Sequence, residues 1–376
     1  MSQTQSPEAH QDERQRPVVT GLGAVTAYGW GEKRVRDGLY SARSAVSPVP
    51  APASASVHDV RWMAVVSDEG EAVDGPDPVA RAARFAAREA FADAWERGWR
   101  PGGSVGVIHA VAGAASGGSA DVVAQIAHEL AAAGPTMTVT GGSTAGAAAL
   151  ISATTWIAAG LADDVVVVAT DLSASHGQPA TTNGVPSLHT EAPARVVCRP
   201  FQEGSIGPNP GEASVAFVLS SQSAGAYGAV AGWALTQGTA PRPGVPDRVQ
   251  LGQAVATALS VADLPATSVA YLNAHGSGVP DSDTAEAGLL DGPFAGAAGV
   301  YSLKPLLGDC GAASALVELL AVLYGFATGV VPAAPRHGAG HARLLDGPTA
   351  AVDGPVVKTS IGPTGQIAAL VVRPGD

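Results

Sequence analysis

Apolar residues are grouped along this 376-residue chain in blocks that predict its secondary structure. Residues 136–139 and 165–168 are typical of strands, and the second, VVVV, shows no polar alternation. Between them, residues 144–161 would be apolar nearly all round a helix. Helices and strands of this kind are buried on both sides. The pattern therefore predicts a layered α/β domain with residues 134–171 at its centre.

Similar patterns predict further elements on both sides of this unit. The remaining expected strands lie within residues 17–31, 62–66, 104–113, 214–219, 229–235, 269–272, 300–303, 356–360 and 367–372, and the remaining helices at 32–44, 78–95, 122–133, 248–261 and 312–328. Strands and helices follow a similar order in residues 17–226 and 227–376, so two related halves are expected. The polar residues 1–16 are expected to form a disordered leader.

Ser143 lies where the first central strand turns into the apolar helix, in the small-residue run Gly141-Gly142-Ser143. Backbone N–H groups at a helix start carry partial positive charge, which stabilises an anion or an activated nucleophile. This is the arrangement of a nucleophile elbow. The alternative is that a small serine merely fits a tight turn.

Composition excludes several classes of function. The net charge of −12 argues against nucleic-acid partners and against anionic membranes. Two cysteines, Cys198 and Cys310, provide neither a disulfide framework nor metal-ligand spacing, so no metal is expected. The N-terminus lacks the apolar core of a signal peptide, and the longest apolar run, 145–162, contains Ser, Thr and Trp. We therefore expect a cytoplasmic protein whose apolar helix is part of the core.

Several motifs resemble the β-ketoacyl synthase family of condensing enzymes. The run GGSTAG at 141–146 is similar to the family's T-A-C-A-S-G, with Ser143 in place of the active-site cysteine. PVVTGLGAVTAYG at the start and Arg199-Pro200-Phe201 also match family motifs. The resemblance runs from Pro17 to Arg373 and implies a duplicated thiolase-like fold, a five-layer αβαβα architecture with two buried mixed sheets. Residues 17–226 and 227–376 would be its halves.

The resemblance also assigns roles to residues of the C-terminal half. The family's N-A-H-G-T-G-T-P appears as NAHGSGVP, which keeps His275 and places Ser277 where a threonine contacts the pantetheine arm. The family's K-S-x-x-G-H keeps Lys304 but has Asp309 in place of the second histidine, while Glu318 matches the supporting acid. An ionised carboxylate would repel a malonyl group and cannot donate a hydrogen bond.

The C-terminal G-F-G-G turn of the family, which supplies an oxyanion donor beside the substrate, corresponds to a run containing Pro363 and Gly365. Proline has no N–H, so this donor is lost. Loss of one such donor typically costs about 100- to 1,000-fold in rate. Decarboxylative condensation is therefore not expected.

Two functions remain open. The chain resembles the chain-length factor of type II polyketide synthases, a ketosynthase homologue that lacks the cysteine and pairs with a competent ketosynthase. The intact His275 motif does not fit this reading, and neither does a residue as small as Ser143. Alternatively, Ser143, His275 and Asp309 form a serine triad for acyl transfer or thioester hydrolysis on acyl carrier substrates. That requires Asp309 to reach the far nitrogen of His275.

The resemblance implies an acyl carrier protein as partner, with substrates on its phosphopantetheine and no other cofactor. We also expect dimerisation, as a heterodimer with a ketosynthase or as a homodimer, through the buried strand at 136–139. Arg81, Arg84 and Arg88, on one face of a predicted helix, are a candidate carrier-docking patch, or simply a solvated face. The short connection at 114–121 implies an altered acyl pocket.

The same residues could instead have purely structural roles. His275 could be a satisfied core histidine, and Asp309 could pair with Lys304 or cap the following helix. Cys310 is expected to be a small buried residue.

Overall fold

The computed structural model describes residues 16–50, 60–67, 77–112, 121–175, 181–182, 185–186 and 198–375. The predicted leader, up to residue 15, and the predicted short connection at 114–121, except Asp121, lie outside these residues.

One mixed sheet of eleven strands runs through the molecule, in the order β13-β12-β16-β17-β11-β1-β10-β7-β5-β6, with β2 paired to β1. Its strands are β1 (Val18–Thr26), β2 (Gly29–Trp30), β5 (Val105–Val111), β6 (Thr136–Thr140), β7 (Asp164–Asp171), β10 (Ala213–Ser220), β11 (Gly228–Gln237), β12 (Tyr271–Asn273), β13 (Gly299–Tyr301), β16 (Val356–Ile361) and β17 (Gln366–Pro374). Two separate sheets were expected. Instead β1 and β11 join them through two residue pairs, Val18 with Ala229 and Val19 with Gly228.

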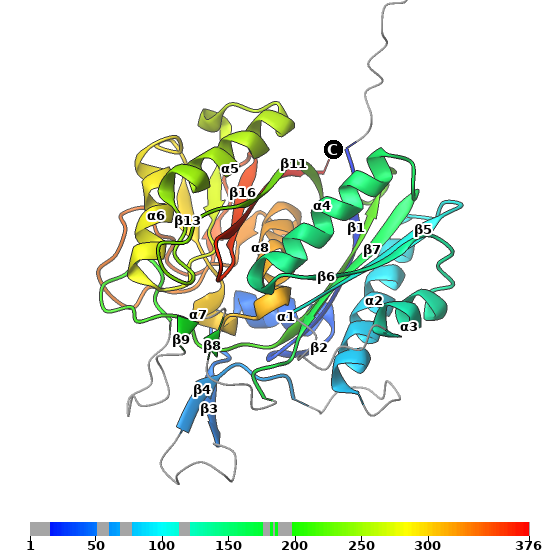
Figure 1. The fold of residues 1–376 in the computed structure, drawn as a ribbon, viewed down its shortest axis with the longest axis horizontal. Coiled ribbons are helices and arrows are strands. Elements are labelled where there is room, and N and C mark those ends of the chain that lie inside the picture. The colour runs from blue at the N-terminus through cyan, green and yellow to red at the C-terminus, as the bar shows by residue number, and fades with distance from the viewer. Residues whose placement is uncertain are drawn as a thin grey trace, which may run out of the picture.

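Helices lie in three layers around this sheet (Figure 1). The helices α2 (Pro78–Glu96) and α3 (Asp121–Glu129) cover the outer face of the N-terminal strands. On the other side, α5 (Arg248–Ala262) and α6 (Pro280–Asp291) cover the C-terminal strands. Between the two parts of the sheet lie α4 (Ala145–Ala158) and α8 (Ser314–Thr328). The predicted αβαβα layering is thus confirmed.

Smaller elements connect these layers. They are α1 (Glu32–Tyr40), α7 (Lys304–Leu307), the 3-10 turns η2 (Gly142–Thr144), η3 (Ala266–Ser268) and η4 (Gly311–Ala313), and the short strand pairs β3 (Ser47–Pro50) with β4 (Val60–Met63), β8 (Thr181–Thr182) with β9 (Val185–Pro186), and β14 (Val330–Val331) with β15 (Thr349–Ala350).

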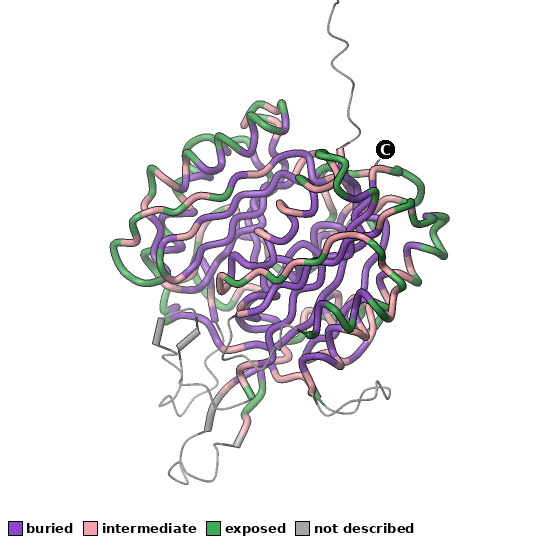
Figure 2. The backbone as a smooth tube through the Cα atoms, turned by 45° about the vertical axis from the view of Figure 1, so that its right-hand side comes forward, coloured by how far each residue is buried: buried purple, intermediate pink, exposed green. Residues whose placement is uncertain are grey.

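Burial is concentrated in the strands and the two central helices, as Figure 2 shows in purple. All eight residues of β7 are buried, as the VVVV run predicts. Among the described residues, one helical stretch, Gly311–Thr328, is apolar and long enough to cross a membrane, with a mean hydropathy of 1.6. Within the fold 78% of it is buried between the sheets, which accounts for its apolar character.

Among the longer elements, α6 and β6 differ from the sequence expectation. Helix α6 was not predicted, because its first half, PDSDTAE, is polar and its inward-facing residues include Asp283 and Glu286. Strand β6 was predicted to be buried, but it is an edge of the sheet, where its five residues alternate between exposed and half-buried. Among the strands of the described residues, none pairs with the other side of β6.

Candidate functional site

Ser143 lies in the 3-10 turn η2 and is fully buried. Strands β16 and β17 and the turn η4 pack against it. Gly146, one helical turn further on, permits this approach, since a Cβ there would lie 2.8 Å from the carbonyl oxygen of Ala312. The fold thus brings the elbow, the segment containing Asp309 and the 362–365 turn to one place.

The hydroxyl of Ser143 donates to Asp309, with 3.3 Å between Oγ and Oδ1. The same carboxylate oxygen accepts from the Ser314 hydroxyl at 2.7 Å and from the Gly311 N–H at 3.1 Å. Asp309 therefore holds Ser143 and the start of the helical segment leading into α8. Its bond to the Gly311 N–H lies at the start of η4, whereas the N-cap of α8 is Ala313.

His275 lies at the end of β12, buried, with a different set of partners. Its backbone N–H donates to Glu286 Oε1 at 2.9 Å, and its ring Nδ1 lies 3.5 Å from Lys304 Nζ. Burial and the charges of Lys304 and Lys358 hold the pKa of His275 well below its usual value, so the ring is neutral. With the Lys304 ammonium group facing Nδ1, this nitrogen is assigned as the acceptor of the neutral ring, which places the ring proton on Nε2. In this tautomer Nε2 is a donor and not a general base.

Beneath His275, one carboxylate lies between two lysines. Glu318 Oε1 is 2.6 Å from Lys304 Nζ, and Glu318 Oε2 is 2.6 Å from Lys358 Nζ. Lys304 also donates to the His275 carbonyl at 2.7 Å. Burial lowers the pKa of Lys358, whereas for Lys304 the effect of burial is outweighed by Glu318 and Asp309, which raise its pKa. This buried trio fixes the loop that carries His275.

Sequence reasoning missed three residues that support the site. Lys358 was hidden in the strand VVKTSI, where one lysine in an apolar run gives no sign of a partner. Asp283 accepts from the Phe201 N–H at 2.9 Å and the Gly278 N–H at 3.1 Å, and burial raises its pKa to about 8. Glu286 binds the His275 N–H and, at 2.8 Å, the Gly276 N–H. Their spacing of three, directly after the NAHGSGVP motif, was the available signal.

The predicted substrate-binding residues lie at the ends of neighbouring elements. Ser277 is buried, and its hydroxyl accepts from the Val279 N–H at 3.2 Å. In the β16–β17 turn, Gly362 donates to the Gln366 carbonyl at 2.8 Å and Gly365 donates to the Gly362 carbonyl at 3.4 Å. Pro363 has no N–H to offer. The two glycine donors are thus used inside the turn.

Two of the three candidate docking arginines, Arg84 and Arg88, form ion pairs within the fold. Arg84 and Arg88 of α2 both pair with Glu129 of α3, with N–O distances of 2.5 and 3.3 Å. These two side chains therefore join helices α2 and α3. Their positions fit the interpretation as a solvated helix face better than the interpretation as a carrier-docking patch.

The two cysteines are buried, and burial raises the pKa of both thiols well above the usual value. The expectation of a small buried Cys310 is confirmed. Within the described ranges, no group of three or more His, Cys, Asp or Glu side chains could hold a metal ion.

Comparison with known proteins identifies two adjoining matches. Residues 103–224 match the β-ketoacyl synthase N-terminal domain, and residues 227–336 match the β-ketoacyl synthase C-terminal domain. The chain is 32% identical over 220 residues to the tetracenomycin polyketide synthase ketoacyl synthase alpha subunit of Streptomyces glaucescens, covering 55% of this chain and 51% of that protein. It is 29% identical over 227 residues to an oxytetracycline polyketide putative β-ketoacyl synthase 1 of Streptomyces rimosus, covering 57% and 53%. The match thus spans about half the length of these curated relatives.

Solved structures share the fold. The ishigamide ketosynthase/chain length factor superposes with a TM-score of 0.80 at 22% identity, covering 96% of this chain and 99% of that one. A type II polyketide synthase structure, of an acyl carrier protein in complex with its ketosynthase, gives 0.79 at 20% identity, covering 96% and 100%. At these identities the likeness shows a thiolase-like fold.

Proposed function

Because this chain belongs to the β-ketoacyl synthase family, with homologues among type II polyketide ketosynthases, we propose that it is a non-condensing subunit that pairs with an active ketosynthase, as a chain-length factor does. The contact of Ser143 with Asp309 carries this proposal. A serine hydroxyl needs an adjacent base to become a nucleophile. Here the Ser143 hydroxyl donates to a carboxylate oxygen that already accepts from two other donors.

The serine-triad alternative needs His275 between Ser143 and Asp309. Among the described residues, the hydrogen bonds run instead from Ser143 directly to Asp309 and between Lys304 and the His275 ring. In this arrangement the Ser143 hydroxyl meets the carboxylate directly, while the His275 ring faces Lys304. The geometry favours the non-condensing role over acyltransferase or thioesterase activity.

Intact-protein mass spectrometry tests the choice. The protein is incubated with an acyl carrier protein loaded with a short acyl chain, beside Ser143→Ala and His275→Ala variants. We expect no covalent adduct on any of the three and no β-ketoacyl product after malonyl carrier protein is added. A mass increase that disappears in both variants would establish a serine acyl-enzyme and overturn the proposal.

We infer that the partners are an acyl carrier protein and a ketosynthase subunit, the components of the two solved structures described above. We place this assembly in the cytoplasm, with no cofactor beyond the carrier's phosphopantetheine. A homodimer would use the same surface as a heterodimer.

The edge strand β6 is the proposed dimer surface. The N–H of Val107 in β5 donates to the Pro135 carbonyl, and β5 and β6 pair in parallel from Val107 with Thr136 onward. Because hydrogen-bonding groups alternate sides along a parallel strand, those of Thr136, Thr138 and Thr140 face away from β5. An unpaired edge of this kind is a template for a strand from another chain.

Thr138→Pro is expected to weaken the dimer while leaving the fold intact. Proline removes the outward N–H of residue 138 but no hydrogen bond to β5. Sedimentation velocity with the candidate ketosynthase should show the dissociation constant rising by about 10-fold, since one lost interfacial hydrogen bond and a distorted edge cost on the order of 1–2 kcal/mol. Thr138→Val, which keeps the N–H, is the matched control. Equal dimer affinity of the two variants would show that β6 is not the interface.

A further inference from the structure

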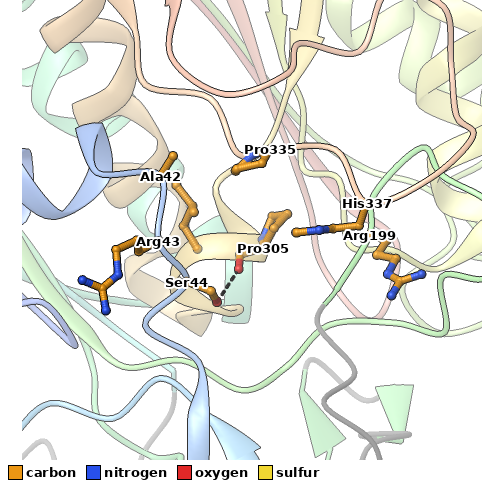
Figure 3. A pocket seen from close by; sticks show the side chains of 8 residues that line it. Ala42, Arg43, Ser44, Arg199, Pro305, Pro335 and His337 are labelled. Atoms are coloured by element: carbon orange, nitrogen blue, oxygen red, sulfur yellow. Dashed lines mark hydrogen bonds between the residues drawn. The ribbon is translucent and has the colours of Figure 1, made fainter.

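A groove lined by none of the predicted site residues opens where four segments meet (Figure 3). Its volume is about 480 Å³, within the range of about 300–1,000 Å³ that small-molecule pockets occupy. Its described lining is Ala42, Arg43, Ser44, Arg199, Pro305, Leu306, Pro335 and His337. These residues come from the loop after α1, the segment before Phe201, helix α7 and the loop after β14.

The groove is cationic in a strongly acidic protein. Two arginines and a histidine line it, and its described lining includes no Asp or Glu. Within the described part of the chain, neither Arg43 nor Arg199 has an ion pair, whereas Arg84 and Arg242 pair with carboxylates. The Nε of Arg199 is buried there without a hydrogen-bond partner. With a net charge of −12 on the chain, unpaired cations around one hollow indicate a site for an anion.

The two arginines of the lining lie apart from each other. Figure 3 shows Arg43 and Arg199 on opposite sides of the view, with Pro305 and His337 between them. The hydroxyl of Ser44 is already committed, since it donates to the Pro305 carbonyl at 2.7 Å. Pro305 and His337 therefore lie between the two arginines, and the cationic or imidazole donors of the described lining belong to Arg43, Arg199 and His337.

We propose that this groove binds an elongated small molecule with an anionic group at each end and an apolar spacer between them. The guanidinium fork of arginine matches both phosphate and carboxylate oxygens in a bidentate manner. One arginine at each end would hold one anionic group, and the proline-lined middle would contact the spacer. This site is independent of any acyl chemistry at Ser143, so it stands whether or not the proposed function does.

Calorimetric titration with α,ω-alkane bisphosphonates of increasing spacer length tests the proposal, with methylphosphonate as the single-ended probe. A two-ended site gives an affinity maximum at one spacer length, about 100-fold tighter than methylphosphonate, because the second contact is intramolecular. A parallel series of dicarboxylates shows which anionic group is preferred. An affinity that does not depend on spacer length in either series would overturn the proposal.

Variants connect this signature to the two arginines. Arg43→Gln and Arg199→Gln should each abolish the length dependence and leave binding like that of methylphosphonate. Arg248→Gln, at an exposed arginine that begins α5, is the control and should behave like the unmodified protein. Arg43 is exposed, so its variant carries the test even if replacing the half-buried Arg199 lowers stability in a thermal scan. Equal behaviour of Arg43→Gln and Arg248→Gln would refute the assignment.

Discussion

Replacing Glu318 with glutamine is expected to lower the free energy of unfolding by about 3–5 kcal/mol, the usual cost of breaking a buried ion pair on one side. Glu318 is the carboxylate within 2.6 Å of both Lys304 and Lys358, and all three side chains are almost fully buried. The isosteric amide keeps the packing but leaves two buried ammonium groups without that charge. Denaturant unfolding monitored by circular dichroism measures the loss.

The pH dependence of this variant has a defined sign. Burial already lowers the pKa of Lys358, and removing Glu318 lowers it further. Between that lowered pKa and the ordinary lysine value of about 10.4, the unfolded chain binds more protons than the folded one, so stability rises with pH. The deficit of Glu318→Gln should therefore shrink as the solution becomes more alkaline.

Glu129→Gln is the matched control for charge at a carboxylate. Glu129 also bridges two cations, Arg84 and Arg88, but its side chain is 19% exposed. Pairs open to solvent contribute about 0–1 kcal/mol. A similar loss in the free energy of unfolding for both variants would show that burial does not make the Glu318 ion pairs more important than the exposed ones.

A variant that combines Ser143→Cys with Asp309→His is expected to condense slowly. Adding a backbone N–H at residue 363 should raise its condensation rate by about 100- to 1,000-fold, because an oxyanion donor is typically worth that much. The comparison is between Ser143→Cys with Asp309→His and the same pair combined with Pro363→Phe. Pro363 lies in the turn whose two glycine N–H groups bond to carbonyls of the same turn, so neither of them replaces the missing donor. Formation of β-ketoacyl product from acyl and malonyl carrier proteins is the measurement.

Pro363→Ala in the same background separates the N–H from the aromatic ring. Both Ala and Phe supply a backbone donor, and both should raise the rate by a similar factor. A gain with phenylalanine alone would assign the effect to the ring. Equal rates with and without Pro363 would show that the turn plays no part in holding an oxyanion.

The architecture could be predicted from the sequence because its central elements are apolar without interruption. The buried strand β7 and the central helices α4 and α8 follow directly from runs such as VVVV. Helix α6 escaped because its inward side carries Asp283 and Glu286, whose partners are backbone N–H groups of a loop. Periodicity detects apolar burial and gives no sign of polar burial that is satisfied by backbone donors.

The candidate site was only partly predictable for a related reason. Motif positions predicted that Ser143, His275 and Asp309 belong to one region, but residue types could not show which atoms meet. His275 meets Lys304 where the loop after β12 passes α7. The pairing of Ser143 with Asp309 depends on how closely η4 approaches η2. That approach depends on side-chain size at Gly146 and is a property of the packed structure.

The location of β1 has a consequence for how this protein is made. Its strand, residues 18–26, pairs with β10 near residue 213 and touches β11 near residue 228. During synthesis the first strand must therefore wait for about two hundred further residues before either neighbour leaves the ribosome, and such distant pairings form slowly. Until then the part of this apolar strand before Val25, where β2 pairs with it, lacks its sheet neighbours in the nascent chain. Expression yield should accordingly rise when chaperones that bind extended apolar segments are co-expressed. This rise should be larger than the stability of the folded protein alone would predict.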